Sequence, residues 1–171
     1  MKLTYQIRFL DYWHTSSGLS AGAKLDSSVV KDSDNLPYLS GKTIKGLVRE
    51  MAELLDDSSF IKECFGSKGL DMGECYFSNA ILNKDEKNEI VLNNLQDNLY
   101  LVIASTKIDN GIAVDDSLRE IEVVIPITLE GYIDDIPDKY IDNISKSIKM
   151  IKRVGLNRNR GLGRCIIEEI K

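Results

Sequence analysis

Basic side chains concentrate in one segment near the C-terminal end of the sequence. Seven basic residues and no Asp or Glu lie between positions 146 and 164, namely Lys146, Lys149, Lys152, Arg153, Arg158, Arg160 and Arg164. Arg158 and Arg160 belong to a glycine-rich stretch, 155–163, where backbone N–H groups and guanidinium groups can approach phosphate oxygens closely. The alternative is a solvated helix face whose positive charges favour the helix C-terminus. We interpret the segment as a phosphate-binding element.

A second basic group is expected on a helix. Lys42, Lys45 and Arg49 are spaced by three and four residues, so a helix places them on one edge near its N-terminus. Such an edge suits an RNA phosphate. The run 40–43, with the sequence SGKT, also resembles the end of a nucleotide-binding P-loop. We reject ATP or GTP binding, because Leu36 stands where that motif requires a glycine.

Acidic and histidine side chains that could do chemistry lie in the long stretch 13–40, which is rich in Gly, Ser, Ala and Asp. A carboxylate such as Asp26 or Asp32, beside basic residues, can hold a divalent metal or orient a 2′-hydroxyl. Most loop aspartates instead cap turns, and a histidine beside a tryptophan, as His14 is, more often packs than transfers protons. Residue types alone therefore assign no catalytic group here.

The net charge of the chain hides this distribution. Its 171 residues carry a formal charge of −5, which by itself argues against a nucleic-acid partner. Outside 146–164 the chain has 15 basic and 27 acidic residues, a balance of −12. One positive element on an acidic body favours a single confined RNA track, because the acidic exterior discourages indiscriminate RNA binding.

Composition bounds the class of protein. With 43% hydrophobic and 29% charged residues, we expect one globular domain over residues 1–171. No apolar run approaches the roughly 18 residues of a membrane span, and the first residues enter a strand-like pattern directly. The three cysteines form no CxxC pair, and His14 is the only histidine, so a His/Cys zinc site is disfavoured. We expect a cytoplasmic protein with reduced thiols and no membrane contact.

Hydrophobic periodicity predicts the elements that must position these residues. The order is strand, helix, strands, helix, strand, typical of an α+β ferredoxin-like or RNA-recognition-motif fold, here with a long first loop. The predicted elements are a strand over 4–12, a helix over 41–55 capped by Ser40, a shorter helix over 60–65, strands over 74–82, 99–108 and 118–133 with a break at Pro126, a helix that Pro137 opens, and a last strand over 164–170. The polar stretch between 82 and 99 is expected to be a connection.

Three blocks of the sequence stand out: 13–49, with its runs WHTSSG, LDSSVVKD and LPYLSGKTIKGLVR, then 108–119, and 155–164. These blocks are similar to the RAMP proteins of CRISPR systems. They most resemble the repeated backbone subunit of the type III (Csm/Cmr-like) RNA-targeting complexes. The resemblance implies a RAMP fold with a thumb-like hairpin, based at Lys107 and Asp109, and a C-terminal Gly-rich loop. The chain is short for such a subunit, and its terminal loop has Asn159 where many relatives carry Ser and lacks their doubled glycine. These departures fit a minimal variant, a capping subunit, or a subunit of a less common type III system.

The same resemblance implies the partners and the residues that bind them. Such subunits grip a guide RNA through the first helix and the Gly-rich loop, and they stack with copies of themselves and with other type III effector subunits. Each thumb displaces one nucleotide of a single-stranded target RNA. The RNA-binding positions carried over in this way are His14, Lys42, Lys45, Arg49, Gly155, Asn157, Arg158, Arg160, Gly161, Gly163 and Arg164.

The resemblance also implies a reaction. Asp26 matches a loop aspartate that promotes endoribonuclease cleavage of the target beside the flipped nucleotide, with Mg²⁺ or another divalent metal held at Asp26. Asp32 matches a second loop aspartate, which we interpret as structural. Two alternatives remain: a non-catalytic RNA-binding scaffold, and a metal-independent nuclease that processes guide RNA through His14.

Overall fold

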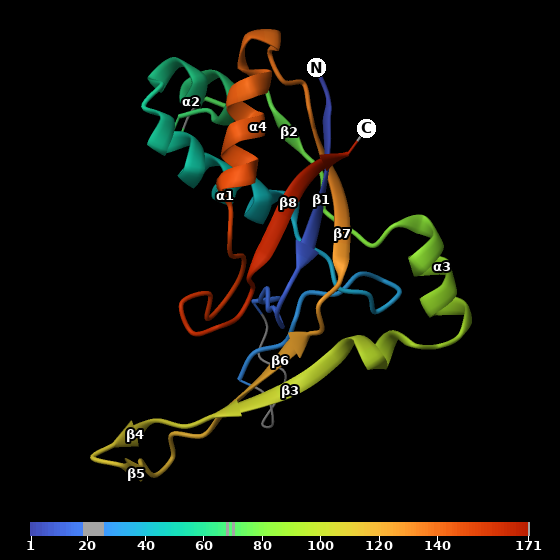
Figure 1. Cartoon of the computed structure of the whole chain (residues 1–171), viewed down its shortest axis with the longest axis vertical. Helices are drawn as coiled ribbons and strands as arrows, with labels where there is room; N and C mark the ends of the chain where they lie inside the picture. The colour runs from blue at the N-terminus through green and yellow to red at the C-terminus, as the bar shows by residue number, and fades with distance from the viewer. Residues whose placement is uncertain (19–25, 68, 70, 171) are drawn as a thin grey trace.

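A four-stranded antiparallel sheet forms the centre of the molecule (Figure 1). The structure is a computed structural model and describes residues 1–18, 26–67, 69 and 71–170. The strands lie in the order β2-β7-β1-β8, and each neighbouring pair is antiparallel. They are β1 (Leu3–Phe9), β2 (Tyr76–Phe77), β7 (Thr128–Asp134) and β8 (Cys165–Ile170).

Helices join these strands in the order of a ferredoxin-like fold. Helices α1 (Gly41–Ala52) and α2 (Ser58–Phe65) lie between β1 and β2, and α4 (Ile141–Met150) lies between β7 and β8. The α+β, ferredoxin-like prediction is therefore confirmed. Short 3₁₀ turns extend this framework at η2 (Glu53–Leu55), η3 (Gln96–Leu99) and η4 (Asp138–Tyr140).

One face of the sheet carries the core. In β1 the alternate residues Leu3, Tyr5, Ile7 and Phe9 are buried, as the period of two predicts. Helices α1 and α4 pack against each other on this side, with their apolar stripes turned toward the sheet. The side chain of Ser40 accepts the N–H of residue 43 and caps α1, as expected.

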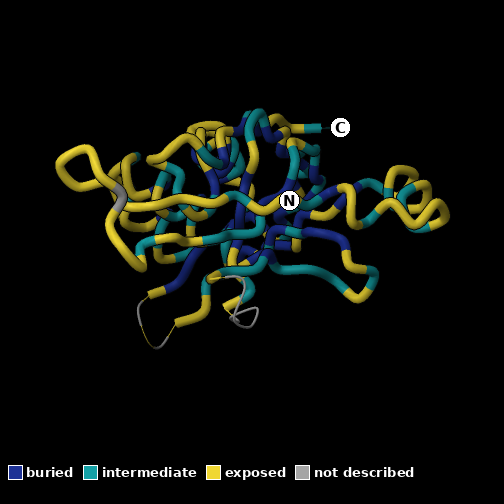
Figure 2. Tube along the Cα trace, turned by 90° about the horizontal axis from the view of Figure 1, so that it is seen from below, coloured by how far each residue is buried: buried dark blue, intermediate teal, exposed yellow. Residues whose placement is uncertain are grey.

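An insertion between β2 and β7 protrudes from the sheet. A two-stranded ribbon, β3 (Tyr100–Ser105) with β6 (Arg119–Val124), leads to a tip hairpin, β4 (Ile108–Asp109) with β5 (Ile112–Ala113). Asn110 and Gly111 form the two-residue turn, and both have a positive φ, which type I′ turns require. We call residues 100–124 the thumb. The thumb tip and α3 (Lys84–Leu92) extend from opposite sides of the buried centre (Figures 1 and 2).

The sequence prediction missed α3. None of its residues is buried, so its sequence lacks the apolar stripe that identifies a surface helix. Its start does carry a local signal, because the Asn83 side chain accepts the Glu86 N–H at 2.9 Å. No helix in the described part of the chain is long and apolar enough to cross a membrane.

Candidate nucleic-acid interface

The Gly-rich loop, residues 155–163, is clamped to the segment that follows β1. The N–H of Leu156 donates to the His14 carbonyl at 2.9 Å, and the N–H of Gly163 donates to the Tyr12 carbonyl at 2.8 Å. Gly155 has a φ of +96°, and a Cβ there would overlap the His14 carbonyl oxygen. Only glycine fits this approach. Gly155 and Gly163 therefore hold the loop in place.

The ring of His14 is fully buried and joins the first loop to the thumb. Its Nδ1 lies 2.6 Å from the Glu122 carbonyl, which can only accept, so Nδ1 carries the proton. Its Nε2 then accepts from the Ser27 hydroxyl at 3.0 Å. The expected contact between this side chain and RNA is therefore corrected: the ring lies in the interior, with both nitrogens engaged by the protein. This arrangement also argues against a nuclease that uses His14 as its base.

Asp26 lies at the base of the thumb with an exposed side chain. Its N–H donates to the Glu120 carbonyl at 2.9 Å, and its Oδ2 accepts the Glu120 N–H at 2.8 Å. The next residue, Ser27, pairs with Ile121 of β6. The strand thus orients the carboxylate. Residues 19–25, which precede it, lie outside the described part of the chain.

The surroundings of Asp26 fit a lightly coordinated metal ion. Within the described residues, no three or more His, Cys, Asp or Glu side chains gather closely enough to form a protein-only metal site. Mg²⁺ commonly takes only one or two protein carboxylates and completes its shell with water and substrate phosphates. The exposed carboxylate of Asp26 suits that arrangement. Asp32 does not compete for this role, since its Oδ1 accepts the N–H groups of Asp34 and Leu36 at 2.8 and 2.9 Å.

Helix α1 presents the predicted basic edge. Lys42 is exposed, and Lys45 and Arg49 are half-buried on the same side of the helix. Arg49 forms an ion pair with Glu53 at 3.1 Å, one turn further along α1. The edge begins at the helix N-terminus, where backbone N–H groups favour an anion.

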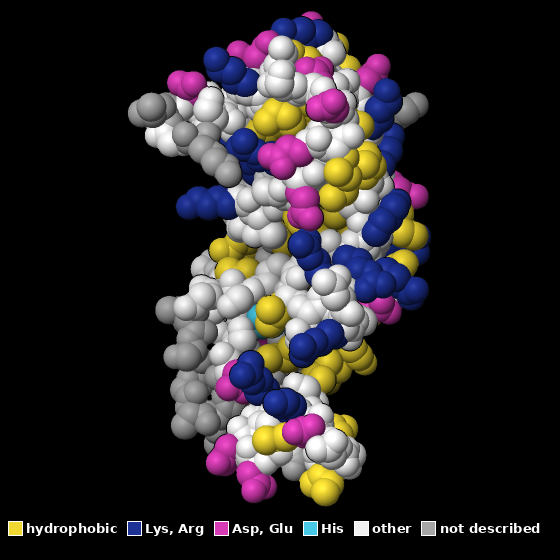
Figure 3. Space-filling view, turned by 90° about the vertical axis from the view of Figure 1, so that its left-hand side faces the viewer, with side chains coloured by type: hydrophobic (Ala, Val, Ile, Leu, Met, Phe, Trp, Pro, Cys, Tyr) yellow, Lys and Arg dark blue, Asp and Glu magenta, His cyan; other side chains and the backbone are white. Residues whose placement is uncertain are grey.

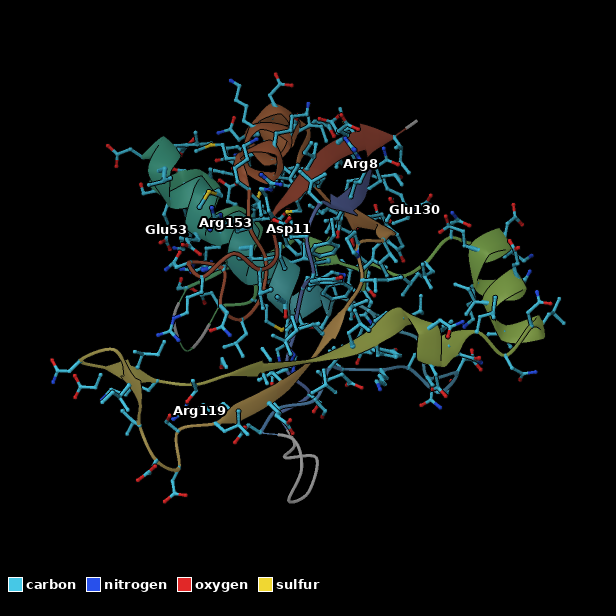
Figure 4. All side chains as sticks on the ribbon, turned by 60° about the horizontal axis from the view of Figure 1, so that its bottom comes forward. Arg8, Asp11, Glu53, Arg119, Glu130 and Arg153 are labelled. Atoms are coloured by element: carbon cyan, nitrogen blue, oxygen red, sulfur yellow. The ribbon has the colours of Figure 1, made fainter. Side chains whose placement is uncertain are left out.

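Acidic partners hold Arg158 of the Gly-rich loop and Arg164, which follows this loop, on the protein surface. Arg158 Nη1 lies 3.5 Å from the Glu50 carboxylate of α1, and Arg164 Nε lies 3.1 Å from that of Asp11. Arg153 donates to the carbonyl of Arg158. The stick view labels Asp11 and Arg153 together with Arg119 of β6, which lies on the thumb (Figure 4). The Glu50 pair joins the two predicted RNA-binding elements, and such exposed pairs are weak enough to yield to a phosphate.

A groove of about 590 Å³ separates the Gly-rich loop from the thumb. It brings Arg160 to the same cavity as Lys107 and Arg119, which are distant in sequence. Hydroxyl and carboxylate groups share the lining, which comprises Ser105, Thr106, Lys107, Val114, Asp115, Asp116, Ser117, Arg119 and Arg160. The sequence analysis placed Arg119 near the thumb but missed it as a binding residue. Its only sequence signal is a cation at the start of a strand.

The two residues expected at the thumb base lie at different levels of the hairpin. Lys107 lines the groove, but Asp109 pairs with Ile112 beside the two-residue turn and therefore lies at the tip. The ribbon starts at Tyr100, further back than the resemblance suggested, so its base is formed by β3 and β6. Lys and Arg side chains gather across the middle of the face toward which the thumb points (Figure 3).

Known proteins resemble this chain in sequence pattern and in fold. The sequence model of the RAMP superfamily matches residues 6–166. A chain of the cryo-EM structure of the Type III-B Cmr-beta bound to cognate target RNA superposes with a TM-score of 0.78 at 10% identity, over 99% of this chain and 97% of that one. A chain of the apo-state Type III-B Cmr-beta structure gives 0.74 at 12% identity, over 100% and 98%. At identities this low, the superpositions show a shared fold alone. A search of the curated proteins finds no match.

Proposed function

Because the chain belongs to the RAMP superfamily, we propose that it is a guide-RNA-binding subunit of a type III CRISPR effector complex. One observation carries the proposal: α1, the Gly-rich loop and the thumb base, which are far apart in sequence, converge on one face and direct cations to it. The fold shared with chains of Type III-B Cmr-beta supports it. The proposed partners are guide RNA, single-stranded target RNA, copies of this chain and other effector subunits.

The guide RNA backbone would follow α1 and then the Gly-rich loop. Phosphates replace Glu50 as the partner of Arg158 and Asp11 as the partner of Arg164. The exchange is favourable because an RNA strand offers a continuous row of anions and releases its counterions on binding. Lys107, Arg119 and Arg160 extend the same track toward the thumb through the 590 Å³ groove.

Loss of guide RNA tests the binding proposal. We expect the double substitution Arg158→Ala with Arg160→Ala to abolish retention of guide RNA by the assembled complex. The matched control, Lys84→Ala with Lys87→Ala, removes the same number of positive charges from α3. This helix lies on the opposite side of the fold from the Gly-rich loop. Absorbance at 260 and 280 nm measures the RNA that purifies with each complex. Equal RNA content in both double variants contradicts the proposed track.

We further propose that this subunit cuts the target RNA at Asp26. The Glu120 N–H fixes the carboxylate at the thumb base, next to the face on which the RNA would lie. A divalent ion bound there would stabilise negative charge that develops on the scissile phosphate. The other residues then act by position: the thumb separates the strands, and the loop arginines hold the backbone on either side.

A non-catalytic scaffold is the second candidate, and the 2.8 Å bond from the Glu120 N–H to the Asp26 carboxylate favours it, because that bond gives Asp26 a structural role in fixing the loop to β6. The two candidates differ in one experiment. The complex carrying Asp26→Asn, which preserves the acceptor for the Glu120 N–H, is incubated with complementary target RNA and Mg²⁺. Asp85→Asn on α3 is the control. The nuclease proposal predicts that regularly spaced fragments vanish only in Asp26→Asn and in EDTA, with guide RNA still bound. Persistent fragments in Asp26→Asn would establish the scaffold.

A further inference from the structure

Two cysteines meet where α2 turns back toward β2. Cys64 lies in the last turn of α2, and Cys75 immediately precedes β2. The N–H of Cys75 donates to the Cys64 carbonyl at 3.2 Å, and the preceding residues, Glu74 and Glu63, pair in the same way at 2.8 Å. The two backbones approach closely enough that a Cβ on Gly73 would overlap the Cys64 carbonyl.

The two thiols form a contact that the third cysteine lacks. Both are free and buried, Cys64 with no exposed surface and Cys75 with 5%. The side chain of each shifts the pKa of the other, with a hydrogen bond between the two thiols as the largest cause. Cys165 is also buried, but it lies on β8 opposite Phe9, and burial raises its pKa to about 11. We therefore assign the nucleophilic role to the pair of Cys64 and Cys75. Cys165 serves as a buried cysteine that is expected to take no part in the reaction.

The hydrogen bond assigns different roles to the two sulfur atoms. Donation from Cys64 lowers the pKa of Cys75, and the ammonium of Lys45 contributes in the same direction. The same bond raises the pKa of Cys64, because it holds that proton in place. Cys75 is thus the sulfur that more readily becomes a thiolate, and it is also the one with some exposed surface.

We propose that Cys64 and Cys75 form a redox-modification site, which a small peroxide converts into an intramolecular disulfide. In the first step the Cys75 thiolate attacks one peroxide oxygen, the O–O bond breaks, and hydroxide leaves. Cys75 becomes a sulfenic acid. In the second step the Cys64 sulfur attacks the Cys75 sulfur, the S–O bond breaks, and water leaves with the Cys64 proton. The two sulfur atoms are oxidised by two electrons in total, and the peroxide is reduced to two waters.

The disulfide would stabilise the segment that contacts the N-terminus of α1. The strand that follows Cys75 passes next to the start of this helix, where the Asn79 side chain accepts the Gly41 N–H at 2.9 Å. Closing the 64–75 loop restricts the unfolded chain more than the folded one, in which the two residues already touch. We therefore expect the oxidised protein to melt roughly 5–10 °C above the reduced protein. This inference is independent of RNA binding.

Peptide mapping of the unmodified protein tests the proposal. The protein is treated with stoichiometric hydrogen peroxide, blocked with iodoacetamide, digested with trypsin without reductant, and analysed by mass spectrometry. The expected product joins peptide 63–68 to peptide 69–84 and is lighter by two hydrogen atoms than the sum of the two. Peptide 165–171 is expected to carry the alkylated Cys165. Unlinked thiols, a sulfinic acid at either cysteine, or a link to Cys165 overturns the proposal.

Two variants assign the order of the steps. Cys165→Ser should form the same cross-link, because this side chain takes no part. Cys64→Ser removes the second step, so Cys75 should stop at the sulfenic acid and react with dimedone. A dimedone adduct on Cys64 in the Cys75→Ser protein, with none on Cys75 in the Cys64→Ser protein, overturns the assigned order.

Discussion

The close approach of Gly155 to His14 makes a quantitative prediction with a matched control in the same loop. Gly155 and Gly161 have nearly equal positive φ values, +96° and +94°. A Cβ at Gly161 meets no atom within 4 Å, but a Cβ at Gly155 overlaps the His14 carbonyl oxygen. Alanine at either position incurs the cost of a left-handed backbone, about 1–2 kcal/mol.

Gly155→Ala has two further costs. The Leu156 N–H loses its bond to the His14 carbonyl, about 1 kcal/mol, and the displaced backbone strains a packed region by about 1–3 kcal/mol. We expect Gly161→Ala to destabilise the protein by about 1–2 kcal/mol and Gly155→Ala by about 3–6 kcal/mol. The difference isolates the contact between the loop and His14.

Urea unfolding of the two variants and the parent protein measures these values. The midpoint should fall much further for Gly155→Ala, with an unchanged slope, since the same surface is exposed on unfolding. Retention of guide RNA in the assembled complex should fall with it, because the loop loses its anchor. Equal destabilisation by both substitutions would refute the argument, since it would mean that the Gly-rich loop does not rest on His14.

Three further predictions concern charge. Arg119→Ala should weaken RNA binding and reduce the slope of log K against log salt by about 1, as fluorescence anisotropy at several salt concentrations can measure; an unchanged slope excludes a phosphate contact. Glu50→Gln frees Arg158 and should tighten RNA binding, while it changes the urea midpoint little, and weaker binding would contradict this. The hydrogen bond from Lys139 lowers the pKa of Glu63, so its stabilisation is present above the ordinary pKa of 4.5 and is lost as pH falls below it. Glu63→Gln should therefore lose less stability than the parent between pH 6 and pH 3.5 in urea titrations.

Local sequence signals predicted the framework well where side chains have strong periodic or capping preferences. The alternation in 4–12 and the apolar stripe in 41–55 correspond to β1 and α1 within a few residues. The predicted helix after Pro137 begins instead with the 3₁₀ turn η4, and α4 follows at Ile141. Helix α3 was missed because none of its residues is fully buried and its apolar residues, Ile90 to Leu92, are consecutive, whereas an amphipathic pattern is the main signal of a surface helix.

The candidate site was predicted less completely, because its geometry depends on which residues face inward. His14 is polar and lies in a loop-like stretch, which suggests a surface position, but two hydrogen bonds satisfy its ring in the interior. Asp109 was expected at the base of the thumb but lies at its tip, since a resemblance locates a hairpin in the sequence without its register. Arg119 carried no distinguishing signal until the Gly-rich loop was seen beside it.

By itself the sequence determined the order of the strands and helices of the central fold and the separation of positive and negative charge, and it predicted which segments could bind phosphate. These properties follow from the spacing of side chains along short stretches of chain. Only the tertiary structure decided that Arg160 faces Arg119 across a groove, that Cys64 touches Cys75, and that His14 supports the Gly-rich loop. Such contacts join residues whose distance in space depends on strand order and register, which local spacing does not specify.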